Sequence, residues 1–119
     1  MAVSVTNNAN ADAVAVRNGA TRVKKVEIYQ RSAAAPVLFL QLFNTNSATP
    51  GTTAPEGSVI RIPPGQTGKQ AKQSIVFASE RGGLYLNTGL SYCVTTTHDG
   101  STSPSSADRP QVKIHWCEA

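Results

Sequence analysis

The sequence PVLFLQLFN, residues 36–44, is apolar at nearly every position and is followed by a long loop of Asn, Thr, Ser, Gly and Pro. A run of about nine such residues suits one buried β-strand and is too short to cross a bilayer as a helix. Because both alternating faces of the strand are apolar, we expect it to be covered on both sides. The stretch therefore predicts a central strand in a compact β fold.

Short apolar segments separated by polar loops continue from this strand to the C-terminus. Residues 112–117 alternate most cleanly, with Val112, Ile114 and Trp116 on one face. Residues 90–97 combine alternation with strong β propensity. We expect further strands at 58–62, 74–78 and 84–86, turn-like segments at 66–73 and 79–83, and long loops at 45–57 and 98–110.

The N-terminal quarter contains the strongest two-residue hairpin signal of the chain, Asn18-Gly19. Both residues tolerate the positive φ angles of a type I′ turn. A short strand at 12–17 precedes this turn, and an alternating segment at 21–30 follows it. We therefore predict a β-hairpin over residues 13–29. A helix over 22–29 is the alternative, although such a helix would lack a good cap and a stop signal.

The first eleven residues differ from the rest, because they are small and polar apart from Val3 and Val5. We expect residues 1–11 to form a flexible or extended N-terminal arm and residues 12–119 to form one domain. A chain of 119 residues can bury about two-thirds of its unfolded surface. The number and spacing of the strands predict an all-β fold, a single antiparallel β-sandwich with a jelly-roll-like order.

The net charge of +4 comes from cations that are spread along the chain. Their densest group, Arg22, Lys24 and Lys25, lies beside Glu27. Nucleic-acid binding calls for a basic face with a reading element. We interpret the scattered cations as solvated strand faces and expect no specific nucleic-acid partner and no membrane partner. A nucleic-acid-binding β-barrel is one alternative, and it predicts binding that weakens with salt.

Two cysteines, Cys93 and Cys117, are too far apart in sequence for a metal motif. The N-terminus lacks the basic start and apolar stretch of a secretory signal, so we expect free thiols. If the last two strands paired as a hairpin, His115 would lie near Cys93, with Cys117 one pair away. A disulfide or a zinc site would then be the alternative, although the zinc site would lack a nearby carboxylate.

Catalytic patterns are weak in this sequence. The loop triplet His98-Asp99-Gly100 is similar to the His-Asp pair of some metal phosphohydrolases, but its residues are also those of an ordinary turn. No nucleophile elbow is present, and Asp12, Asp99 and Asp108 lack the spacing of a calcium loop. We therefore expect a protein that is not an enzyme, with no catalytic, cofactor-binding or metal residues and no cofactor.

Five motifs in the last three quarters of the chain follow one another in a fixed order. They are the apolar strand at 37–44, ATPGT at 48–52, VIRIPPG at 59–65, IVF at 75–77 and GLSYCVTTT at 89–97. In this order they resemble a family of small virion-associated proteins found in tailed bacteriophages and prophage regions. The resemblance leaves the first thirty residues uncovered and carries over no site residue. It implies a structural role, either in capsid decoration or in a tail, baseplate or fibre.

Together, residues and resemblance lead to one expected function. The chain would be a non-enzymatic capsid decoration (cement) protein that binds and stabilises the capsid shell. Its partners would be other phage structural proteins, the major capsid protein or tail proteins, and copies of itself in a homotrimer to which the arm contributes. It would be made in the bacterial host cytoplasm and reside in the virion. The alternative is a tail, baseplate or fibre module that binds a receptor glycan, at which Tyr85 beside Asn87 weakly hints.

Overall fold

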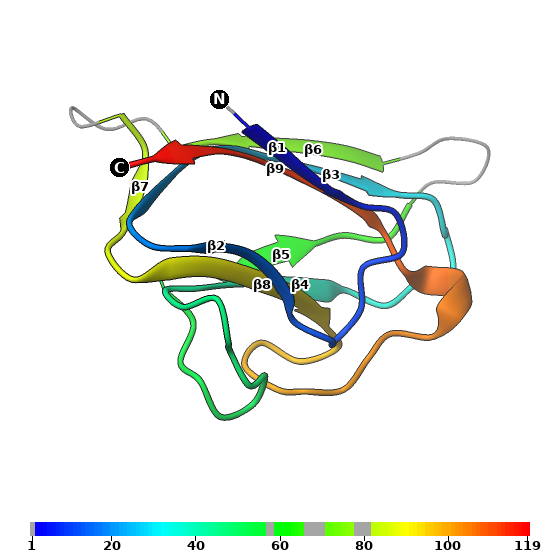
Figure 1. Ribbon diagram of the computed structural model, residues 1–119. Helices are drawn as coiled ribbons and strands as arrows, with labels where there is room; N and C mark the ends of the chain where they lie inside the picture. Colours follow the sequence, from blue (N-terminus) through cyan, green and yellow to red (C-terminus); the bar gives the residue numbers. More distant parts are fainter. Residues whose placement is uncertain (1, 57–58, 66–70, 78–81) are drawn as a thin grey trace.

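The computed structural model describes residues 2–56, 59–65, 71–77 and 82–119. Within these ranges the chain forms nine strands and one short 3-10 turn, η1 (Ser106–Asp108). The strands make two antiparallel sheets that face each other across the core (Figure 1). The predicted all-β antiparallel sandwich is therefore confirmed.

The two sheets divide the strands almost equally. One sheet, called the β9 sheet, contains in order β1 (Ala2–Thr6), β9 (Gln111–Glu118), β3 (Thr21–Gln30) and β6 (Ala71–Val76). A fifth strand of this sheet, β7 (Leu84–Leu86), pairs with the start of β3. The other contains β2 (Val14–Asn18), β8 (Gly89–Thr95), β4 (Leu38–Phe43) and β5 (Ile60–Ile62), and is called the β8 sheet.

Strand pairing is nested along the chain. The first strand, β1, pairs with the last strand, β9, and β2 pairs with β8. Further in, β3 pairs with β6, and β4 pairs with β5. Most pairing partners are therefore distant in sequence, and the chain crosses repeatedly between the two sheets.

The core lies between the inward faces of the two sheets. Alternation along each strand supplies its side chains, because inward positions are apolar where outward positions are polar or covered. Tyr92 of β8 is the largest fully buried side chain, and its hydroxyl contacts the hydroxyls of Ser4, at 3.4 Å, and Thr6 in β1. The fully buried aliphatic core includes Val23, Val26, Ile28, Leu38, Leu40, Leu42, Ile62, Leu86, Leu90, Val94, Val112 and Ile114.

The apolar strand predicted within residues 36–44 is observed as β4. All of its side chains except that of Phe39 are buried, so the prediction of a strand covered on both faces is confirmed. The strands predicted at 84–86 and 112–117 are also confirmed, as β7 and β9. The strand predicted at 90–97 is confirmed as β8 up to Thr95, and residues 96 and 97 are wrong because they already belong to the following loop.

Two segments are only partly described. The strands predicted at 58–62 and 74–78 correspond to β5 and β6, with residues 58 and 78 outside the described residues. The turn-like prediction at 66–73 is wrong for 71–73, which begin β6. Lys72 interrupts the apolar pattern here because β6 is an edge strand and presents this side chain to solvent. Residues 57, 66–70 and 79–81, where loop or turn was predicted, lie outside the described residues.

The predicted hairpin over residues 13–29 is wrong, because β2 and β3 lie in opposite sheets. The turn between them does use Gly19, whose φ of 135° favours glycine. Its N–H donates to the carbonyl of Thr88 at 2.9 Å. An Asn-Gly pair specifies a chain reversal but does not decide whether the next strand lies alongside or crosses to the facing sheet. The alternative helix over 22–29 is also wrong, since this segment belongs to β3.

The segment expected as a flexible or extended arm, residues 1–11, is described from residue 2 onward. Residues 2–6 are extended in β1, and residues 2–11 belong to the sandwich. β1 pairs with β9 along its whole length. Ala9 and Ala11 are buried, and the Asn10 carbonyl accepts a hydrogen bond from the Val94 N–H at 2.8 Å. The N-terminal segment is therefore an edge strand and its connection, not a detached arm.

Candidate functional site

The two long loops cover the outer face of the central strands β8 and β4 of the β8 sheet. The Ser91 hydroxyl donates to the Thr45 carbonyl at 2.6 Å, and Gln41 Nε2 donates to the Gly100 carbonyl at 3.1 Å. Every residue of β8 is buried as a result. In Figure 1 both loops lie on the side of the β8 sheet that is turned away from the β9 sheet.

The outer face of the β9 sheet carries no such loop among the described residues, and we call it the open face. Val3 and Val5 of β1, Val76 of β6 and Tyr85 of β7 are between 50% and 65% exposed. Alternation along the strands places all four on this face. Ile75 and Leu86, the neighbours of Val76 and Tyr85, point inward. Ser4 and Thr6, the neighbours of the two valines of β1, contact the buried Tyr92. Val3 and Val5 lie at one edge of the sheet and Val76 and Tyr85 at the other, with the polar outward side chains of β9 and β3 between them. Exposed apolar side chains with a polar centre on an uncovered face make this face a candidate contact surface.

Cations surround the apolar side chains of the open face. The Nζ atoms of Lys72 and Lys113 lie 5.4 Å and 5.8 Å from the centre of the Tyr29 ring. The Arg22 guanidinium lies 4.8 Å from the centre of the Tyr85 ring. These distances allow cation–π attraction, which fixes the long side chains along the sheet.

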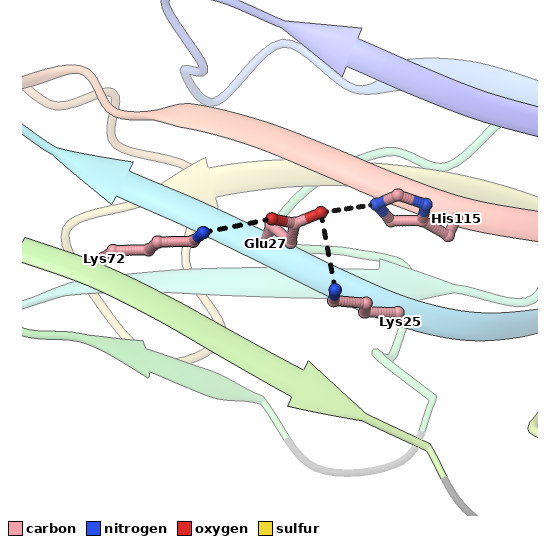
Figure 2. A network of polar contacts seen from close by, with 4 residues as sticks. All are labelled: Lys25, Glu27, Lys72 and His115. Atoms are coloured by element: carbon pink, nitrogen blue, oxygen red, sulfur yellow. Dashed lines mark hydrogen bonds and ion pairs between the residues drawn. The ribbon is translucent and has the colours of Figure 1, made fainter.

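One carboxylate, that of Glu27, lies between Lys72, Lys25 and His115 (Figure 2). His115 Nε2 is 2.7 Å from Glu27 Oε1, and Lys25 Nζ is 3.8 Å from the same oxygen. Lys72 Nζ is 3.8 Å from Oε2. The four side chains come from β3, β9 and β6, so the network joins three neighbouring strands across the sheet.

The charges in this network are stabilised by one another. The hydrogen bond with His115 lowers the pKa of Glu27 below its ordinary value; Lys25 and Lys72 also lower it, against an opposing desolvation effect. The hydrogen bond with Tyr29, together with the charge of Glu27, raises the pKa of Lys72. At neutral pH Glu27 is therefore an anion and Lys72 a cation, and the open face keeps an excess of positive charge.

Sequence reasoning did not connect Glu27 with His115, because 88 positions separate them. The available signal was the alternation within β3 and β9, which places both residues at outward positions. What it lacked was the information that these two strands are neighbours.

The cysteines lie in different sheets, Cys93 in β8 and Cys117 in β9, and both are free. The hairpin considered for the last two strands is therefore wrong, and His115 does not come near Cys93. Burial raises the pKa of the Cys93 thiol to about 12. Within the described ranges, no three His, Cys, Asp or Glu side chains form a group suited to a metal ion.

The other residues weighed as candidate sites have structural contacts. His98 packs edge-on against Phe39, with ring centres 5.9 Å apart. The carboxylate of Asp108 accepts a hydrogen bond from the Ser32 hydroxyl at 2.7 Å. Asp12 donates its backbone N–H to the side chain of Asn10. These contacts hold loops in place.

Two further findings bear on the function. None of the helical segments in the described part of the chain has the length and apolarity needed to cross a membrane. Comparison of the chain with protein-family models and with curated proteins finds no match.

Proposed function

We propose that this chain is a non-enzymatic structural protein of a tailed-bacteriophage virion, and that it decorates the capsid shell. The observation that carries the proposal is the open face, a broad sheet surface with exposed apolar side chains and an excess of cations. The resemblance of residues 31–116 to small virion-associated proteins supports the same role. The protein is made in the host cytoplasm and resides in the virion.

The nested strand pairing adds support from the fold. We infer that this sandwich is a jelly roll. The first strand pairs with the last and the second with the second last, and inside these pairs β3 pairs with β6 and β4 with β5. Jelly rolls occur in viral capsid domains and in lectins. A fold alone does not imply a function, so this support is secondary to the surface.

The partner surface would be acidic and partly apolar, on the major capsid protein or on a tail protein. Lys25 and Lys72 share the single carboxylate of Glu27 with His115. Lys113 and Arg22 lie against tyrosine rings and make no ion pair within the described residues. Charge complementarity with such a partner speeds association and excludes wrong partners. Binding to the assembled shell but not to dissociated subunits stabilises the shell by mass action.

This function can be tested by adding the purified protein to undecorated capsids of the phage whose genome encodes it. We expect the protein to cosediment with the particles and to raise the temperature at which they disrupt. Electron microscopy of the decorated particles would locate it. Absence of the protein from the particles, or particles of unchanged stability, would overturn the proposal.

A charge-reversal pair tests whether the open face makes the contact. Lys72→Glu reverses one cation on that face and should weaken cosedimentation at physiological salt. Arg61→Glu is the matched control with the same change in net charge, because Arg61 is an exposed cation of β5 in the opposite sheet. Equal loss of binding in both proteins would show that net charge, and not this face, is responsible.

Glycan binding at a tail, baseplate or fibre is the second candidate function, and Tyr85 is the observation that favours it. Tyr85 is 51% exposed, and an exposed aromatic side chain offers a stacking surface for a sugar. One side of the ring is already occupied by Arg22, at 4.8 Å. A glycan array tests this alternative: a signal that Tyr85→Ala removes, without binding to capsids, would favour it over decoration.

A further inference from the structure

The open edge of β1 is a contact surface for a second copy of this chain. We propose that the β1 strands of two copies pair antiparallel, so that two β9 sheets join into one continuous sheet across a two-fold axis. The inference concerns self-association and does not depend on the virion role.

β1 is the end strand of the β9 sheet. One of its edges pairs with β9, and no strand of the described chain pairs with the other edge. Beyond that ladder, the backbone of residues 2–6 makes no hydrogen bond within the described ranges. A strand edge with unpaired N–H and C=O groups is a template for another strand.

The other three sheet edges carry features that discourage strand addition. β6 presents Lys72, whose side chain is 54% exposed. β2 has a register shift between Ala15 and Arg17. β5 is only three residues long and runs directly into Pro63. Charges, bulges, short strands and proline are the means by which natural edges avoid pairing, and residues 2–6 have none of them.

The sequence of β1, Ala-Val-Ser-Val-Thr, is complementary to itself. In an antiparallel register centred on Ser4, Val3 of each copy lies opposite Val5 of the other. Both valines point outward, opposite His115 and Lys113 of β9, and are 50% and 51% exposed. Pairing would bring four valines together as two cross-strand pairs, the kind of pair that stabilises sheets.

Charge also favours a second copy at this edge. Each copy carries a net charge of +4, so two copies repel one another at most approaches. Residues 2–6 contain no charged side chain, and no like charges would lie directly opposite each other in the shared ladder. The contact is isologous and closes at two copies, whereas the trimer expected from the sequence requires a heterologous contact.

The mass of the purified full chain in solution tests the pairing, by light scattering on a sizing column over a range of concentrations. We expect twice the 12.5 kDa mass of the chain. Val3→Lys with Val5→Lys places lysines opposite each other across the two-fold axis and should give a monomer. Val76→Lys with Tyr85→Lys is the matched control, because it adds the same two charges at side chains exposed on the same face at the far edge of the sheet, and it should leave the dimer intact.

A charge swap tests the register itself. Val3→Lys with Val5→Glu places a lysine opposite a glutamate at both pairs and should restore the dimer that the double-lysine variant loses. A wild-type monomer at every concentration, a trimer, or a double-lysine variant with the wild-type mass would each overturn the proposal.

Hydrogen exchange on the wild-type chain provides a test that needs no variant to fold. Pairing protects backbone amides of residues 2–6 that face away from β9, so their exchange should slow as the protein concentration rises. Exchange in β5, an edge strand outside the contact, should not change. Exchange of residues 2–6 that is independent of concentration would contradict the pairing.

Discussion

At the scale of single residues, the open face is organised around Glu27. Its side chain is only 14% exposed although it lies on an outer sheet face, because the side chains of β9 and β6 lean over it. The hydrogen bond with His115 and the nearby lysines compensate the anion for this partial burial. A carboxylate held in this way orders the cations around it and leaves the rest of the face positive.

Glu27→Gln should destabilise the fold at neutral pH, and the difference from wild type should shrink in acid. The folded pKa of Glu27 is lowered, so the folded state binds fewer protons than the unfolded state. The contribution of ionised Glu27 to the free energy of unfolding is complete above the ordinary carboxyl pKa of about 4.3. This contribution is lost as the pH falls through the lower pKa of Glu27 in the folded state. Denaturant unfolding at several pH values measures it.

Glu118→Gln is the control for this pH series. Glu118 pairs with Arg17 at 3.1 Å, but its side chain is 71% exposed. An exposed ion pair contributes little to stability, so this variant should unfold nearly as wild type does. A Glu27→Gln difference that stays constant from neutral to acid pH would contradict the charge network.

At the scale of elements, β1 lies between the core and the open edge. Its inward side chains reach Tyr92, while its outward valines extend the open face. Ala9 and Ala11 then bury the connection that follows it. The N-terminal segment thus contributes to the stability of the sandwich as well as to its surface.

Deletion of residues 1–11 should therefore destabilise the domain. Loss of Ser4 and Thr6 leaves the buried Tyr92 hydroxyl without its partners, which costs about 1–3 kcal/mol, and uncovers the edge of β9. Thermal or denaturant unfolding measures the loss. Tyr92→Phe in the shortened chain should recover part of it, because the unpaired hydroxyl is then absent. An unchanged unfolding midpoint would mean that the segment is a detached arm.

At the scale of the whole molecule, the two sheets have opposite roles. The central strands of the β8 sheet, β8 and β4, are covered on both faces, by the core on one side and by the long loops on the other. The β9 sheet is covered by the core on one side only, and its outer face is available to partners (Figure 1). This asymmetry gives the molecule one candidate contact side.

Cys93 should report whether the loops stay closed over the β8 sheet. Its pKa of about 12 leaves about one thiol in ten thousand ionised at pH 8, and the thiolate is the reactive form. In a Cys117→Ser background, a thiol reagent at pH 8 should label Cys93 only under conditions that unfold the chain. Rapid labelling of the native protein would contradict the closed arrangement of the loops.

Local sequence patterns predicted most of the strands and their faces. The apolar run that became β4 and the alternation of β8 and β9 specify which side chains point inward, because side chains alternate strictly along a strand. The same patterns placed Glu27 and His115 at outward positions. They did not predict the contact between these two residues, which requires that β3 and β9 be neighbours.

The sequence by itself determined an all-β chain with particular strands, turns and long loops, since these depend on propensity and on contacts between near neighbours. Only the tertiary structure decided that Asn18-Gly19 links two sheets, that the first strand pairs with the last, and that the loops cover one outer face and leave the other open. The reason is that strand partners and layer order depend on long-range packing of the whole core, which alternation within one strand does not encode.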